Sequence, residues 1–329
     1  LGAGYFSQFH RDGWQRIENA ELVGAADQRI DLARKTGLPA FSNLQQMLEE
    51  VRPDLLDIIT PPPSHMEAIQ TALENGIAAI ICQKPFCTSL QEAQEATRLA
   101  EEAKVPLIVH ENFRFQPWYR EMAKVISEGR LGRIHQLTFR MRTGDGQGPE
   151  AYLARQPYFQ KMKKFLVHET AVHWIDVFQF LLGPVKAVYA DLRKMNPVIE
   201  GEDAAIVIFE MVDDVRAVFD GNRHLDHATS DPRKTFGEAL LEGTEGTLVL
   251  RGDGSLHVRT FGQMEEDTVL LAREWSGFSG DCVHSLQAHV IAALKGESEF
   301  ENTAREYLRV IEIENAIYQS AATGQKQEI

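Results

Sequence analysis

The sequence predicts two domains, an α/β domain with a parallel sheet over residues 1–117 and an α+β domain with a mostly antiparallel open sheet over 118–329. Three observations predict this division. A glycine-rich turn lies at the start, short apolar runs then alternate with helix-like stretches, and beyond Pro117 apolar runs follow one another without intervening helices. Alternation of strand and helix is typical of parallel sheets, whereas successive strands joined by turns indicate antiparallel pairing.

The glycine turn Gly2-Ala3-Gly4 is followed by a helix-like stretch and then by an apolar run that ends at Asp27. Two glycines let the backbone approach a pyrophosphate, and the amides at the helix start favour its charge. A carboxylate at the end of the next strand accepts hydrogen bonds from ribose hydroxyls. We therefore expect a Rossmann-type dinucleotide site, although any strand-to-helix turn can carry two glycines. Its candidate residues are Gly2, Gly4, Tyr5, Phe6, Ser7, Asp27 and Arg29, with Ser7 at the third glycine position.

The choice of cofactor depends on Asp27 and Arg29. Asp27 favours NAD, because a carboxylate repels the 2′-phosphate of NADP. Arg29 can pair with that phosphate, so the sequence leaves NADP open. The first strand of such a domain is expected upstream of Leu1.

The first domain is expected to continue as alternating elements. Helices are predicted over 31–35, over 43–51 with Ser42 as N-cap, over 64–75 with Gly76 at the end, and over 89–104. Strands are predicted over 55–60, 78–82 and 106–109, the first of them stopped by three prolines.

The second domain is expected to begin with a helix over 118–128. Alternating apolar and polar residues then predict strands over 134–142, 185–192, 204–210, 215–221, 238–242 and 247–251. Two helices, over 283–295 and 303–322, are predicted to close the chain.

Composition excludes several classes of protein. With 329 residues and a net charge of −14, the chain lacks the basic excess that nucleic-acid binding needs. No apolar run reaches the roughly 18 residues of a membrane span. The three cysteines have no metal-ligand partners at useful spacing, so we expect no metal site and a cytoplasmic location.

Two further segments follow predicted strands, where ligands of parallel sheets bind. One is Thr60-Pro61-Pro62 with His65, and the other is Gln83-Lys84-Pro85. Proline after Lys84 favours an extended backbone, which can project the lysine outward. Taken singly, each segment could also be an ordinary surface turn.

A helix predicted around residues 168–176 carries a carboxylate and an imidazole. Glu169 and His173 lie one helical turn apart, and such a pair can act as an acid–base unit. His168 and His173 are five residues apart, which does not match the four-residue spacing of a zinc protease. A structural histidine within its own helix is the alternative.

Together these segments resemble the Gfo/Idh/MocA family of dehydrogenases over nearly the whole chain. The matching residues are the glycine turn with His10, Thr60-Pro61-Pro62 with His65, Lys84-Pro85, the run 112–117, the turn 129–132, the Glu169-to-Asp176 helix, the turn 243–246 and the helix around 318–321. Several positions depart from the family pattern. Gln83 replaces the usual Glu, Glu169 replaces the usual Asp, and Phe165-Leu166-Val167 and Ala171 replace the glycines that usually flank this segment.

The resemblance implies an NAD(P)-dependent dehydrogenase that passes a hydride from a hydroxyl of a sugar, polyol or sugar acid to nicotinamide. It implies that His173 removes the hydroxyl proton, that Lys84 hydrogen-bonds the same oxygen, and that Glu169 orients His173 or binds a neighbouring hydroxyl. It also adds cofactor contacts at Thr60, Pro61, Pro62, His65, Gln83, Lys84 and Asn112.

Two alternative functions stay open within the same fold. One is a redox-neutral enzyme that uses bound NAD for glycoside cleavage or isomerisation, and the other is a ligand-sensing regulator. A regulator would not need Lys84, Glu169 and His173 together. By the same resemblance we expect a homodimer or homotetramer formed through the second-domain sheet.

The predicted substrate contacts are Lys84, Arg114, Lys164, His168, Glu169 and His173. Lys161, Lys163, Arg155, Arg223 and His224 lie in nearby or other loops and suggest a site for a substrate carboxylate. A solvated basic loop is the alternative.

Overall fold

The computed structural model describes all residues from 1 to 329 and divides into two compact units. The first unit comprises residues 1–112 and 281–309, and the second comprises 113–280 and 310–329. The segment 281–309, which the sequence analysis assigned to the second domain, therefore belongs to the first unit. Long-range hydrogen bonds to β5 hold this segment there: the Val109 amide donates to the Asn302 carbonyl at 2.8 Å, and Ile108 and Thr303 form an isolated antiparallel bridge.

The first unit contains five strands, all paired in parallel. Strand β1 (Ala25–Ala26) pairs with β2 (Ala40–Phe41), and β4 (Ala79–Gln83) lies between β3 (Leu55–Ile58) and β5 (Leu107–His110). Residues 1 and 2 connect the two groups. The Ile59 amide donates to the Leu1 carbonyl and the Gly2 amide donates to the Ala26 carbonyl, both at 2.8 Å. The predicted parallel sheet is confirmed.

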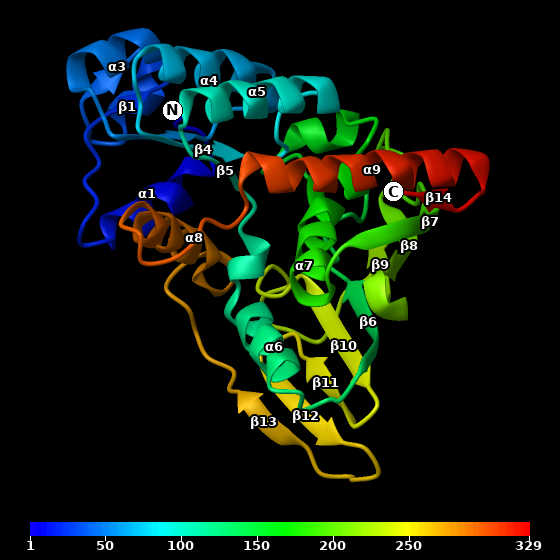
Figure 1. Cartoon of the computed structure of the whole chain (residues 1–329). Coiled ribbons are helices and arrows are strands. Elements are labelled where there is room, and N and C mark those ends of the chain that lie inside the picture. The colour runs from blue at the N-terminus through cyan, green and yellow to red at the C-terminus, as the bar shows by residue number, and fades with distance from the viewer. The chain divides into compact units, whose positions relative to one another are not determined.

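Helices lie on both faces of these strands (Figure 1). They are α1 (Ser7–Gln15), α2 (Ile30–Arg34), α3 (Leu44–Val51), the short 3₁₀ turn η1 (Pro62–Ser64), α4 (His65–Glu74), α5 (Leu90–Ala103), most of α8 (Phe278–Leu294) and the start of α9 (Ala304–Thr323). The predicted N-cap of α3 is wrong by one residue. Asn43 caps it, because its side chain accepts the Gln46 amide hydrogen.

The second unit contains a nine-stranded sheet in the order β13-β12-β11-β10-β6-β9-β8-β7-β14. The strands are β6 (Ile134–Met141), β7 (Val185–Arg193), β8 (Ala204–Met211), β9 (Arg216–Asn222), β10 (Gly237–Gly243), β11 (Gly246–Leu250), β12 (Leu256–Thr260), β13 (Asp267–Leu270) and β14 (Gln327–Glu328). Every pair is antiparallel except β6 with β9, as the prediction of a mostly antiparallel sheet requires. The last three strands were not predicted: β13 and β14 are short and lie at the two edges of the sheet, whereas β12 lies between β13 and β11.

Helices α6 (Pro117–Ser127) and α7 (Val172–Leu182) belong to the second unit. Residues Leu166–Ala171 form a π-helix directly before α7, where the sequence analysis predicted ordinary helix. The fully buried Trp174 anchors α7: its indole N–H donates to the Tyr119 hydroxyl at 2.9 Å and its ring stacks on Phe139. Wide π turns are frequently found at functional sites.

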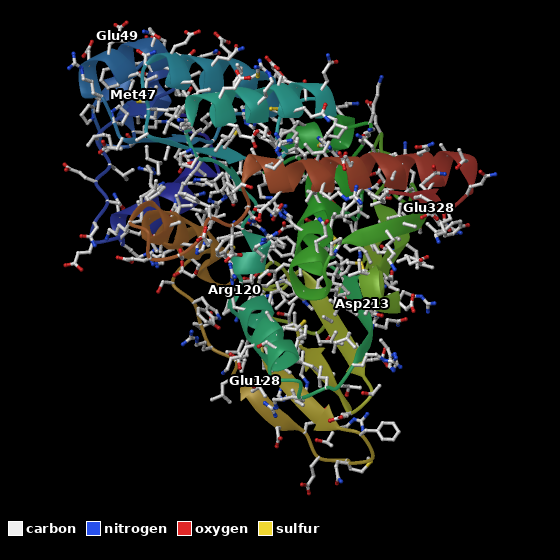
Figure 2. All side chains as sticks on the ribbon, in the orientation of Figure 1. Met47, Glu49, Arg120, Glu128, Asp213 and Glu328 are labelled. Atoms are coloured by element: carbon white, nitrogen blue, oxygen red, sulfur yellow. The ribbon has the colours of Figure 1, made fainter.

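The surface is acidic, as the net charge indicates. Charged side chains such as Glu49, Glu128 and Asp213 lie exposed at the periphery, whereas Met47 is buried (Figure 2). None of the helices is long and apolar enough to cross a membrane.

Candidate functional site

The glycine turn has the geometry that a dinucleotide needs. Gly2 has a φ of +90°, and a Cβ there would lie 3.0 Å from Ile59 and Thr60 backbone atoms, so only glycine fits. A Cβ on Gly4 would meet nothing within 4 Å, so the space beside Gly4 is open. Ser7 is buried and donates to the Gly4 carbonyl at 2.7 Å. The serine at the third glycine position thus holds the turn together.

Asp27 lies against this turn. One carboxylate oxygen accepts the Ala3 amide hydrogen at 2.9 Å and the other accepts that of Arg29 at 2.8 Å. The Arg29 side chain is 76% exposed, with Nε 4.0 Å from Asp27 Oδ1. The sequence-predicted residues of the turn therefore do come together.

The start of α1 has no side-chain cap, and the positive end of a helix favours an anion. The Ser7 and Phe9 amides donate to the carbonyls of Gly4 and Phe6, at 3.2 and 3.1 Å. A hollow of about 390 Å³ adjoins it. Its lining is Ala3, Gly4, Tyr5, Ser7, Gln8, Arg11, Arg29, Leu32, Lys35 and Thr36. The residues present therefore fit a dinucleotide, whose phosphates the start of α1 would hold and whose ribose Asp27 would hold.

Two of the residues predicted to contact the cofactor, His65 and Asn112, are buried. His65 is fully buried, and its Nε2 lies 2.6 Å from the Thr60 carbonyl oxygen. Burial lowers the pKa of His65, which favours a neutral ring. Asn112 is also buried. Pro61 precedes η1 and Pro62 begins it. The contact between His65 and the Thr60 carbonyl therefore holds the backbone directly before these prolines.

A buried polar chain that the sequence analysis missed lies behind Gln83 and Lys84. Asp57 Oδ2 lies 2.8 Å from His10 Nδ1 and 2.7 Å from the Trp14 indole nitrogen. Burial alone raises the pKa of Asp57, but His10, the Trp14 N–H and nearby His110 hold that pKa well below its ordinary range. The available signal was a single aspartate inside the apolar run 55–59.

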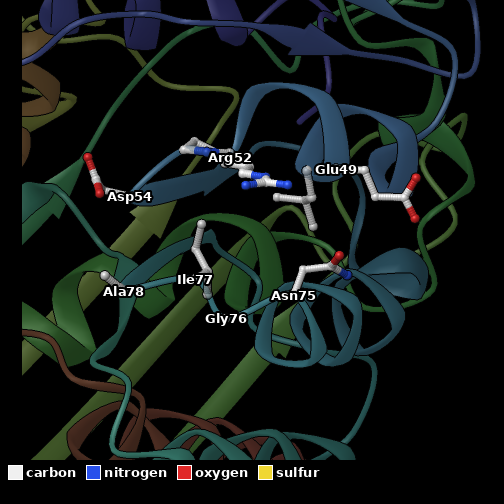
Figure 3. Close-up of a pocket in the computed structure, with 9 residues that line it drawn as sticks. Glu49, Arg52, Asp54, Asn75, Gly76, Ile77 and Ala78 are labelled. Carbon is white, nitrogen blue, oxygen red and sulfur yellow. The ribbon is translucent and has the colours of Figure 1, made fainter.

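A second hollow, of about 430 Å³, lies at the opposite end of the strands (Figure 3). Asp54 immediately precedes β3 and Ala78 immediately precedes β4, so this hollow lies at the amino ends of the strands. Arg52 and Glu49 also line it. Cofactors of parallel sheets bind beyond the carboxyl ends, so the hollow beside Gly4 is the cofactor candidate.

In the second unit, His173 occupies the first turn of α7. It is buried, and its ring lies parallel to that of Phe113 at a centroid distance of 3.8 Å and an angle of 7°. This packing limits rotation of the imidazole. Glu169 lies on the π-helix before it and is half-buried.

Arg114, a predicted substrate contact, is paired with Asp176 on α7. Its Nε and Nη2 donate to the two carboxylate oxygens at 2.8 and 2.5 Å, and both side chains are nearly buried. A bidentate guanidinium–carboxylate pair is strong and directional. The charge of Arg114 is therefore compensated within the protein.

Most of the other candidate cations also have partners. Arg223 is buried, lies 3.2 Å from both oxygens of Asp145 and donates to Thr170. Burial alone lowers the pKa of Arg223, but Asp145, Tyr152 and Glu169 raise it. Further partners are Arg155 with Asp145, Lys161 with Glu200, Lys164 over the Tyr318 ring, His168 with Glu314, and His224 with Asp203.

Glu202 caps the π-helix, a role that sequence reasoning missed. Its Oε1 accepts the amide hydrogens of Phe165 and Val167 at 3.1 and 3.0 Å and the Tyr318 hydroxyl at 2.7 Å. Its own carbonyl accepts the Leu166 amide hydrogen. A carboxylate at a helix N-terminus is favourable, so Glu202 fixes the segment that carries Glu169.

Two protein-family models match the chain, one over the glycine turn and the parallel strands and the other within the second unit. A family model described as "Oxidoreductase family, NAD-binding Rossmann fold" matches residues 1–111. A second model, described as "GFO/IDH/MocA C-terminal domain", matches residues 119–249.

Individual relatives match over the full chain. The D-apiose dehydrogenase of Paraburkholderia graminis is 30% identical over 100% of this chain and 88% of its own length, and that of Rhizobium rhizogenes is 27% identical over 100% and 96%. A crystal structure of an oxidoreductase from Agrobacterium radiobacter, in complex with NAD⁺, L-tartaric acid and magnesium, superposes with a TM-score of 0.89. It is 24% identical and covers 99% of this chain and 96% of that one, which shows that the fold is shared.

Proposed function

The chain belongs to the GFO/IDH/MocA family of oxidoreductases, and from this premise we propose that it is an NAD-dependent dehydrogenase of a small neutral sugar. The observation that carries the proposal is the 30% identity, over the whole chain, to a protein named D-apiose dehydrogenase. The glycine turn with Asp27 supports NAD as the cofactor. Alternative substrates of the same reaction class are polyols and sugar acids.

The chemistry assigned to this chain is removal of a proton from a substrate hydroxyl. NAD, when bound, would supply the acceptor for the hydride of that hydroxyl's carbon. We assign proton removal to His173, whose ring is held by Phe113, and stabilisation of the developing oxyanion to the Lys84 ammonium group. Glu169 orients His173 or binds a neighbouring hydroxyl.

The pairing of the cations favours an uncharged substrate. Arg114 and Arg223 each have a carboxylate partner, and Arg155 shares Asp145 with Arg223. A substrate carboxylate would compete with these internal partners. Arg114, Arg155 and Arg223, three of the cations that suggested a sugar acid, are therefore better explained as structural pairs.

The test is NADH formation over a panel of D-apiose, other aldoses, polyols and aldonates, with NAD and NADP run in parallel. We expect turnover with NAD on an uncharged sugar and a kcat/KM on the matching aldonate at least about tenfold lower. An equal or higher kcat/KM on the aldonate would reject the neutral-substrate proposal. Turnover without net NADH would instead indicate a redox-neutral enzyme that uses bound NAD.

We also propose that the exposed face of the second-unit sheet pairs with a second copy of the chain. Tyr189, Ile208 and Leu240 on this face are 44%, 38% and 36% exposed. The strand register joins them in one cross-strand row, namely Tyr189, Ile208, Val218, Thr138, Leu240 and Val249. Charges of both signs flank this row, which suits a self-complementary two-fold interface.

Sedimentation of the native chain and of Ile208→Glu tests this assembly. We expect a dimer or tetramer for the native chain and a shift to monomer for the variant. Glu49→Gln, at an exposed position of α3, is the control and should leave the mass unchanged. A monomeric native chain would reject the interface.

The free, buried thiols of Cys82, Cys87 and Cys282 suit a reducing compartment. They support the proposal that the enzyme works in the cytoplasm.

A further inference from the structure

A chain of three polar side chains runs through the first unit to the backbone of Lys84. Asp57, on β3, bonds the fully buried His10 at Nδ1, with a separation of 2.8 Å. On the other side of the ring, His10 Nε2 lies 3.0 Å from the side-chain nitrogen of Gln83, on β4. The side-chain oxygen of Gln83 then accepts the Lys84 amide hydrogen at 2.8 Å.

The direction of each hydrogen bond follows from the groups that make it. A backbone amide can only donate, so the Gln83 oxygen faces Lys84 and its NH₂ group faces His10. An NH₂ group can only donate, so His10 Nε2 is an unprotonated acceptor. Nδ1 then carries the single ring proton and donates it to Asp57, which makes His10 neutral.

We propose that Gln83 is a positioning residue that keeps His10 neutral and so holds the Lys84 backbone in one geometry across the neutral pH range. The proposal rests on the function assigned above to Lys84. It also gives a reason for the amide at this position, where the family pattern described above has a carboxylate.

The reason is that a carboxylate cannot replace both bonds of the amide. Glu at position 83 could still accept the Lys84 amide hydrogen, but two acceptors would then face each other across the His10 Nε2 contact. The conflict ends only if His10 takes up a second proton and donates from both ring nitrogens. The hydrogen-bonded chain would then depend on pH.

The surroundings of His10 determine how strongly such a proton is held. The groups around the ring are Asp57 on β3, Gln83 on β4, His110 on β5 at a ring-centroid distance of 4.1 Å, and the Phe6 ring at 5.5 Å. From α8, the Gln287 side chain donates to the His10 carbonyl, and the Leu1 amino group donates to the Asp57 carbonyl. Asp57 is the anion bonded to the ring, and it is present in both variants compared below.

The first experiment uses the cofactor-free chain labelled with ¹⁵N-histidine and observed by NMR, with His10→Asn to assign the signals. For the native chain we expect the neutral Nδ1–H pattern for His10, unchanged between about pH 6 and 8. For Gln83→Glu we expect an imidazolium pattern at the lower end of that range. An imidazolium or an Nε2–H tautomer in the native chain would overturn the proposal, as would identical patterns in both.

The second experiment measures the Kd of NAD by calorimetry over the same pH range. For Gln83→Glu we expect an additional rise in Kd with increasing pH, of about tenfold relative to the native chain, as the proton on His10 is lost. Gln83→Met removes both bonds without adding charge, so its Kd should be weaker than native by a constant factor. Gln70→Glu, on the exposed surface of α4, adds the same charge elsewhere and should behave as native.

These readouts separate two kinds of failure. If Gln83→Glu does not fold, the NMR pattern of native His10 and the flat pH response of Gln83→Met still decide the proposal. If Lys84→Met keeps full activity, the assigned role of Lys84 is wrong, yet the His10 pattern remains a valid test of what Gln83 does. A parallel pH response of Gln83→Glu and native chain would reject the positioning role.

Discussion

The two units hold their functional side chains by different means. Behind Lys84, the first unit uses one carboxylate, Asp57, and otherwise neutral hydrogen bonds through His10, Gln83 and the buried His65. Around His173, the second unit uses ion pairs, such as Arg114 with Asp176. Neutral bonds respond little to salt or pH, whereas a buried ion pair becomes costly as soon as one partner is removed.

This difference between the units corresponds to the groups that each unit must position. The cofactor turn presents main-chain amides, whose geometry depends on backbone placement, and neutral bonds suffice for that. The helix with His173 begins in a π-helix at Leu166–Ala171 and needs a charged cap at Glu202. The comparison predicts larger losses of stability from single substitutions in the second unit.

The largest expected effect is on turnover, in both units. Lys84→Met and His173→Asn should each lower kcat by about 10²–10⁴, because each group stabilises or removes charge in the transition state. Steady-state kinetics on the best substrate measure this. Lys295→Met, an exposed lysine after α8, is the matched control. Near-native kcat in both active-site variants would reject the assignment.

The next effect separates the two units by stability. Arg114→Met leaves Asp176 as an unpaired buried charge and should lower the free energy of unfolding by about 3–5 kcal/mol. Urea unfolding measures the loss. The double variant Arg114→Met/Asp176→Leu should recover most of it, since neither charge remains. A loss below about 1 kcal/mol in the single variant would mean that the pair is solvated.

A smaller effect is expected at the cap of the π-helix. Glu202→Ala removes the acceptor of two backbone amides and of the Tyr318 hydroxyl, which should cost about 1–3 kcal/mol of stability. Because Glu169 lies on this π-helix, kcat should fall while the Kd of NAD stays native. Tyr318→Phe removes one of the three bonds and should cost less. An unchanged kcat would show that the cap does not position the helix.

The smallest effect concerns pH in the first unit. The folded-state pKa of Asp57 lies below its ordinary value, so its contribution to stability is complete above about pH 4, the unfolded-chain value, and declines as pH falls below it. Asp57→Asn should therefore be less stable than native by about 1–2 kcal/mol at pH 7. Urea unfolding at several pH values should show this gap closing on acidification. A gap that widens below pH 4 would contradict the shifted pKa.

Much of the first unit could be predicted from the sequence, because the sequence signals for its elements are local. The alternation of apolar runs and helical stretches predicted the parallel strands, and Gly2 and Gly4 with Asp27 predicted the turn whose geometry the structure has. Each of these signals reflects a backbone conformation or a strand end, which nearby residues determine.

Other features depend on residues far apart in the chain. The return of residues 281–309 to the first unit depends on bonds between Asn302 and the end of β5. The cap at Glu202 acts on residues 165–167, and the partner of Arg114 is 62 residues away. Neither periodicity nor spacing reports such pairings, so the sequence left open both a substrate carboxylate site and a solvated basic loop, whereas most of these cations have internal partners.

By itself, the sequence determined the two-domain class, the order of most strands and helices, and the identity of the polar residues at the strand ends. These follow from side-chain periodicity and from the conformational needs of glycine and proline, which act over a few residues. Only the tertiary structure decided which charges are compensated, where the π-helix begins, and that Gln83 bonds both His10 and Lys84. Those outcomes depend on which groups are buried together, and burial obliges each polar group to find a partner wherever the fold brings one near.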